Sequence, residues 1–124
     1  MGSKKILTTV ILLVLTVFPN CTSLKSVPDE LIGTWTTEAQ EYCKSSLELD
    51  QKTIQFCKKD GTVDNYSIIK IKRQRLKGAW VRYTIFYRDH KLKKYEFPIL
   101  YNPYKNGIVR FLNKDQNTWI RESL

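Results

Sequence analysis

The chain has 124 residues, a formal net charge of +9 at pH 7 and 42% hydrophobic residues. This length fits one domain with a single modest core. With one histidine and three cysteines, the chain offers no Cys-x-x-Cys pair, paired histidines or paired-carboxylate motif. The sequence therefore identifies no metal site, cofactor site or catalytic residue, and we expect a protein that is not an enzyme.

The first twenty residues have the layout of a secretory signal. Lys4 and Lys5 precede the mostly apolar stretch 6–18, which is the order of charged and apolar regions in an export leader. As a helix this stretch would span roughly 20 Å, whereas the hydrocarbon core of a bilayer is about 30 Å thick. We therefore predict that residues 1–20 form a signal peptide and that the protein is exported.

Cys21 stands just beyond this apolar stretch, and two fates are open to it. A cysteine at this place resembles the lipidated first residue of bacterial lipoproteins. That resemblance implies a lipoprotein signal at 1–20, a tether at 21–28 and a membrane-anchored protein of the cell envelope, in the outer membrane. Alternatively, Cys21 and Ser23 supply the small residues of an ordinary leader cleavage site after Ser23. That cleavage discards Cys21 and gives a soluble periplasmic or secreted protein.

Cys43 and Cys57 remain as an even pair after either fate of Cys21. Exported chains favour disulfides, so we predict a Cys43–Cys57 bridge. It would close a short loop and add about 3 kcal/mol of stability on the chain-entropy estimate. Because the two cysteines have opposite parity on neighbouring strands, the bridge requires Cys43 to lie off the regular ladder or at a bulge.

From Leu31 onward, β-branched and aromatic residues are interrupted by frequent turn signals such as Asp60-Gly61 and Asn106-Gly107. This spacing is typical of a sandwich or barrel. The predicted strands are 31–38, 45–49, 53–58, 62–72, 79–88, 93–101, 107–112 and 117–122. We therefore predict an all-β domain at 29–124, an eight-stranded antiparallel up-and-down barrel whose closure would remove exposed sheet edges.

Alternation along two of these strands separates an inner face from an outer face. Inward positions place four tyrosines in the barrel interior as candidate ligand-binding residues: Tyr83, Tyr87, Tyr95 and Tyr101. The opposite face carries a candidate surface-interaction strip: Trp80, Arg82, Phe86 and Arg88. Basic residues gather in this region, and removal of the two leader lysines from 21 basic residues leaves 19 against 12 acidic ones, a formal charge of +7.

Gly33-Thr34-Trp35 opens the first predicted strand after a short turn that could begin at Asp29. This arrangement resembles the Gly-x-Trp motif of lipocalins and their relatives in the calycin group. The resemblance implies that Gly33 allows close backbone approach and that Trp35 packs inward across the closed end of an eight-stranded barrel. It also implies that Arg121, near the end of the final strand, lies over the indole in a cation–π contact.

Two functional hypotheses follow from these features. The first is a non-enzymatic exported lipoprotein with a lipocalin-like barrel that binds a small apolar or amphipathic ligand. The alternative is an envelope-surface interaction protein with a filled core, in which the basic and aromatic strip binds anionic lipid or polysaccharide. For an exported protein these partners are more available than nucleic acid, which we do not expect it to bind.

Overall fold

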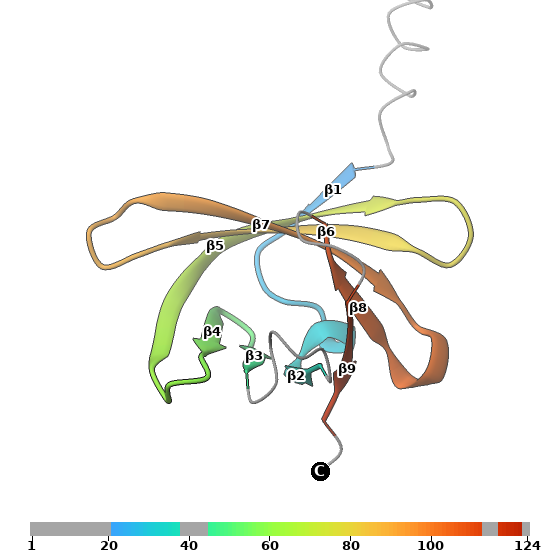
Figure 1. Cartoon of the computed structure of the whole chain (residues 1–124). Helices are drawn as coiled ribbons and strands as arrows, with labels where there is room; N and C mark the ends of the chain where they lie inside the picture. The colour runs from blue at the N-terminus through green and yellow to red at the C-terminus, as the bar shows by residue number, and fades with distance from the viewer. Residues whose placement is uncertain (1–20, 38–44, 113–116, 123–124) are drawn as a thin grey trace, which may run out of the picture.

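The computed structural model describes residues 21–37, 45–112 and 117–122. Nine strands and two short 3-10 helices make up this part of the chain (Figure 1). In chain order they are β1 (Cys21–Leu24), η1 (Asp29–Leu31), β2 (Gly33–Thr36), β3 (Ser46–Leu49), β4 (Thr53–Cys57), β5 (Val63–Arg75), β6 (Val81–Arg88), β7 (Lys94–Asn102), η2 (Tyr104–Asn106), β8 (Ile108–Phe111) and β9 (Thr118–Arg121).

Eight of these strands close into an antiparallel barrel. Each strand from β2 to β9 pairs with its neighbours in sequence, and β9 returns to pair with β2 through Trp35 with Arg121 and Thr36 with Ile120. The ring of strands is visible in Figure 1. The predicted all-β, eight-stranded up-and-down barrel is confirmed, with strand boundaries that lie within a few residues of those expected from the alternation.

The long strand β5 contains an irregularity that the alternation did not predict. Its register against β6 shifts between Ile68 and Lys70. Because of this bulge, both Ile68 and Ile71 are buried, while Ile69 between them is 38% exposed. One extra residue in a ladder reverses the inside and outside positions that follow it. Arg73 consequently takes the inward parity of Ile71 and is half-buried, whereas Lys70 and Lys72 are exposed on the outer face.

Strand β1 is the ninth strand, and it lies within the stretch 21–28 that we expected to act as a tether. It pairs antiparallel with β5, from Cys21 opposite Gln74 to Leu24 opposite Ile71. The pairing of β4 with β5 ends at Ser67. Strand β1 therefore pairs with a part of the same β5 edge that lies beyond the end of β4. An uncovered edge presents unpaired backbone groups, and this short strand satisfies them.

The segment after β1 leads into one end of the barrel, where η1 lies within the ring of strands in Figure 1. Val27 donates a backbone hydrogen bond to Gln51 in the β3–β4 turn, at 2.8 Å. Leu31 is fully buried. The largest fully buried side chains form one core around it: Trp35, Tyr83, Leu47, Leu49, Ile54, Ile71, Ile85, Ile99 and Val109. We call this end of the barrel the closed end.

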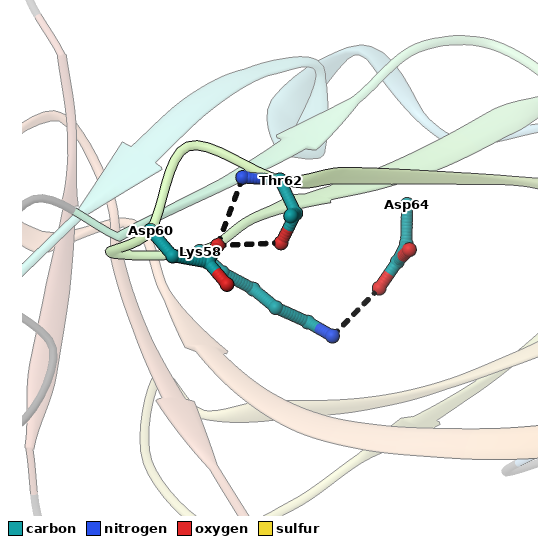
Figure 2. Close-up of polar contacts among 4 residues, drawn as sticks. All are labelled: Lys58, Asp60, Thr62 and Asp64. Carbon is teal, nitrogen blue, oxygen red and sulfur yellow. Dashed lines mark hydrogen bonds and ion pairs between the residues drawn. The ribbon is translucent and has the colours of Figure 1, made fainter.

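The hairpin between β4 and β5 lies at the other end of the barrel from η1 (Figure 1) and turns at the predicted Asp60-Gly61 pair. Figure 2 shows the polar contacts of Lys58, Asp60, Thr62 and Asp64 in this hairpin. The Asp60 carboxylate accepts hydrogen bonds from the Thr62 backbone N–H at 2.9 Å and the Thr62 hydroxyl at 2.6 Å. These bonds hold the pKa of Asp60 below its ordinary value. Lys58 forms an ion pair with Asp64 at 3.0 Å, and this contact raises the pKa of Lys58. The local polar contacts therefore support the register of the hairpin.

Gly107 provides a test of packing at the closed end. Its φ is +109°, and an added Cβ would lie 3.0 Å from Trp35 Cη2. We expect Gly107→Ala to lower the free energy of unfolding by about 2–4 kcal/mol, because it adds both backbone strain and a steric overlap. Urea denaturation measures this change.

Gly61→Ala is the matched control for this substitution. Gly61 also has a positive φ, +87°, but an added Cβ would meet nothing within 4 Å. We expect a loss of about 1–2 kcal/mol from backbone strain alone. Equal losses in the two variants would contradict the tight packing of Gly107 against Trp35.

Candidate functional site

The closed end of the barrel is sealed by Arg121, Trp35 and η1. The Arg121 guanidinium carbon lies 5.0 Å from the centroid of the Trp35 ring, as the lipocalin resemblance implies. Arg121 also donates a hydrogen bond to the backbone carbonyl of Glu30, and the Trp35 indole N–H donates to the Leu31 carbonyl at 3.0 Å. These contacts join the first and last strands of the barrel to the helical turn.

Gly33 supports this seal through its backbone conformation. Its φ is +136°, in a region that favours glycine. An added Cβ would lie 3.6 Å from the Arg121 side chain, which is ordinary van der Waals distance. The requirement for glycine therefore comes from the positive φ at the start of β2, and close approach contributes less than the resemblance implies.

Two of the four candidate tyrosines belong to the sealed region. Tyr83 is fully buried and Tyr101 is 5% exposed. The Tyr83 hydroxyl donates a hydrogen bond to the Glu30 carboxylate, and Tyr101 packs edge-on against Trp35 with ring centroids 6.3 Å apart. These two side chains help to fill the closed end of the barrel. Sequence reasoning did not identify Glu30, whose signal was only an acidic residue in the turn before Gly33.

The other two tyrosines, Tyr87 and Tyr95, lie near the opposite end of the barrel and are half-buried. They stack on each other with ring centroids 5.3 Å apart. They belong to a larger group that we call the aromatic cluster: Phe56, Tyr66, Tyr87, Tyr95, Phe97, Phe111 and Trp119. The hairpins β4–β5 and β6–β7 connect strands at this end.

Phe56 joins two arms of the aromatic cluster. Its ring centroid lies 5.9 Å from that of Tyr87 and 5.5 Å from that of Phe97. On one side Tyr66 stacks on Tyr87 at 5.1 Å. On the other side Phe97 packs edge-on against Phe111 at 4.9 Å, and Phe111 stacks on Trp119 at 4.6 Å. Rings from β4 to β9 are therefore linked in one continuous series of aromatic contacts.

Exposure distinguishes the aromatic cluster from the sealed core. Trp119 is 3% exposed, but the other six members are only half-buried. The inward parity of Phe56 and Phe97 was readable from alternation. The contribution of Tyr66, Phe111 and Trp119 was missed, because it depends on how distant strands meet around the barrel.

The outer strip is partly assembled as expected. Arg82 and Phe86 are half-buried on the outer face of β6, and Arg88 is exposed. The ammonium groups of Lys70 and Lys72 lie 5.0 Å and 5.4 Å from the Phe86 ring centroid.

Trp80 lies outside β6 and makes a separate contact with Arg110 of β8, whose guanidinium carbon is 5.1 Å from its ring. Cations therefore lie over both aromatic residues of the strip.

The cysteine prediction needs correction. Cys57 is a free cysteine in the structure, so the predicted disulfide is not formed, and Cys43 lies outside the described residues. Cys57 follows Phe56, which packs against the core, and accordingly faces the outer side of β4. There it accepts a hydrogen bond from the Gln55 amide at 3.6 Å. The opposite parity of Cys43 and Cys57 in the sequence is the physical reason that the predicted bridge is not formed. Cys21 is exposed at the start of β1.

Within residues 21–37, 45–112 and 117–122, no group of three or more His, Cys, Asp or Glu side chains could hold a metal ion. In the same ranges no helix is long and apolar enough to cross a membrane.

No protein-family model, curated protein or solved structure matches this chain. The class of protein is accordingly defined by its architecture, a closed eight-stranded antiparallel barrel compatible with a lipocalin-like fold. One end is sealed by its own side chains, and the aromatic cluster toward the other end is partly buried.

Tyr87 and Tyr101 should make the free energy of unfolding depend on pH in the alkaline range. Burial raises the pKa of Tyr87, with a smaller contribution from Tyr66 and Tyr95, and burial also raises the pKa of Tyr101, where Glu30 adds to the effect and Arg121 opposes it. The contribution of these tyrosines to the free energy of unfolding is fully present below the ordinary tyrosine pKa of about 10. It is lost as pH rises through the higher pKa values of the folded protein, because the unfolded chain releases these protons first.

Tyr87→Phe and Tyr101→Phe test this dependence. In urea denaturation between pH 9 and 12, each substitution should reduce the proton release on unfolding by up to about one proton. An unchanged pH dependence in both variants would show that these phenols are not desolvated in the folded barrel.

Proposed function

We propose that this protein is a non-enzymatic exported lipoprotein that holds a small apolar or amphipathic molecule against the aromatic cluster. The observation that carries this proposal is the partial exposure of six aromatic rings of the cluster beside a buried core. Exposed aromatic surface is unfavourable in water, and each ring covered by a ligand regains part of that free energy. The rings that close the barrel at its sealed end are not available for this role.

The chemistry of the cluster suggests the class of ligand. Phe56, Phe97 and Phe111 offer apolar ring faces, while Tyr66 and Tyr87 add hydroxyl groups that could orient a polar end. Because the closed end is filled, a ligand would enter only part of the barrel. A short acyl chain or a compact ring system fits this description, and the resemblance to lipocalins supports the same class of ligand.

The pairing of β1 supports lipidation at Cys21 over cleavage after Ser23. Cleavage after Ser23 would remove three of the four residues that pair with β5, namely Cys21, Thr22 and Ser23. The edge of β5 would then expose backbone donors and acceptors, at a cost for each unpaired group. Cleavage before Cys21 preserves the whole strand. We therefore propose that the mature chain begins with a lipidated Cys21 in a bacterial cell envelope.

The outer strip supports a second candidate function, binding of an anionic envelope component. Its carrying observation is the placement of Lys70 and Lys72 over Phe86 beside Arg82. Basic and aromatic side chains together are enriched where protein surfaces bind partners. This surface lies on the outer wall, so the two functions use different side chains and can be tested separately.

Photolabelling with a medium-chain diazirine fatty acid tests the ligand site. With the full-length protein in lipid nanodiscs, we expect saturable labelling of Phe56, Tyr66 and Tyr87 that excess unlabelled fatty acid suppresses. Tyr66→Ala with Tyr87→Ala should weaken labelling by roughly tenfold or more, because two ring contacts are lost. Peptide mass spectrometry locates the labelled residues.

Two matched variants serve as controls for this experiment. Tyr104→Ala removes a tyrosine that is 62% exposed outside the aromatic cluster, and Arg82→Glu with Arg88→Glu alters the outer wall. Neither change should affect labelling of the cluster. Labelling that does not saturate, or that is confined to outer residues such as Phe86, would overturn the proposed ligand site.

A further inference from the structure

The outer wall formed by β5, β6 and β7 is strongly cationic. Lys70 lies opposite Phe86, and Gln74 lies opposite Arg82, across the β5–β6 ladder. Arg88 lies opposite Lys94 across the β6–β7 ladder. The basic side chains of this wall are Lys70, Lys72, Arg82, Arg88 and Lys94. Glu96, opposite Phe86, is the acidic residue among the outward positions of these ladders. We call this surface the cationic wall.

Two open grooves flank Phe86 on the cationic wall. One has a volume of about 360 Å³ and combines apolar with charged side chains: Ile69, Lys70, Phe86, Lys94, Tyr95 and Glu96. The other, of about 300 Å³, reaches the edge strand: Cys21, Lys72, Gln74, Arg82, Thr84, Phe86 and Glu96. The grooves thus place cationic groups around a central apolar residue, a pattern suited to phosphate headgroups with the tops of acyl chains between them.

Cys21 lies at the edge of the same surface. It pairs with Gln74, directly beside Arg82 in the next ladder. Because β1 is hydrogen-bonded to the barrel from Cys21 onward, no free linker separates this residue from the wall. A lipid attached to Cys21 would hold the grooves beside the bilayer, within the range of about 10 Å over which surface charges act at moderate salt.

We propose that the cationic wall docks flat on the anionic lipid headgroups of the membrane to which the protein is anchored. The orientation in this inference rests on the proposed lipidation of Cys21. The choice of anionic lipid rests on the positive charge of the wall. The barrel axis then runs along the membrane surface, and the aromatic cluster opens at the level of the headgroups. Tyr95, which belongs to the aromatic cluster and also lines the larger groove, lies where the membrane surface meets the ligand site.

Lysine acylation measures this docking residue by residue. The mature protein, extracted from its own membrane, is reconstituted in vesicles of phosphatidylcholine alone or of phosphatidylcholine with phosphatidylglycerol, and labelling rates are read by peptide mass spectrometry. We expect labelling of Lys70, Lys72 and Lys94 to slow by about fivefold in the anionic vesicles, the factor expected for one basic residue near an anionic surface. High salt should reverse this protection. Lys52 and Lys105, exposed on the β3–β4 turn and on η2, should label equally in both vesicles.

Paired charge reversals provide the control. Lys72→Glu with Arg82→Glu should abolish the protection of Lys70 and Lys94 in anionic vesicles. Lys52→Glu with Lys105→Glu makes the same change in net charge elsewhere and should leave that protection intact. Equal labelling of the wall in the two vesicle types would overturn the proposal. So would protection that requires an added acidic polysaccharide and is absent with anionic lipid alone.

The intact mass of the denatured protein separates failure of docking from failure of the anchor. An acylated Cys21 with an unprotected wall would leave the anchor intact and refute docking. A chain that begins at Leu24 would refute the anchor, and with it the geometry on which the flat orientation depends. An acylated Cys21 together with protection confined to the cationic wall is the result expected here.

Discussion

The structure depends most on the seal at one end of the barrel, where Arg121 lies across Trp35 and binds the turn η1. Cation–π contacts of this kind are worth roughly 0.5–2 kcal/mol, but their placement matters more than their size. The Arg121–Trp35 pair joins the first barrel strand to the last. Because Tyr83 and Tyr101 are packed into this seal, their rings belong to the filled closed end of the barrel.

One short segment connects the proposed lipidation site, the edge of β5 and the closed end of the barrel. Cys21 begins β1, β1 covers the free edge of β5, and Val27 and η1 then carry the chain into the closed end. A force applied at Cys21 would therefore act directly on the barrel wall, because Cys21 already belongs to the ladder with β5. If Cys21 carries a lipid, as we propose, this arrangement would give the protein a defined orientation on the membrane.

Much of the fold could be predicted because period-two alternation and turn residues are local signals. They located all eight barrel strands and placed Tyr83 and Tyr101 inward. Strand β1 was not predictable, since its four residues, CTSL, carry no pattern and are ordered by the edge of β5. Nor could local patterns separate the sealed Tyr83 from the half-exposed Tyr87, because both share one parity and differ only in their distance from η1. The disulfide prediction was wrong because cysteine counting outweighed the opposite parity of Cys57.

The central claim is that the aromatic cluster holds a small molecule in the native protein. A native mass spectrum of the full protein, extracted gently from its own membrane and then denatured, tests this claim most directly. We expect a native mass that exceeds the denatured mass by that of one small apolar or amphipathic compound, which denaturation releases. Identical native and denatured masses would contradict it and would indicate a barrel filled only by its own side chains.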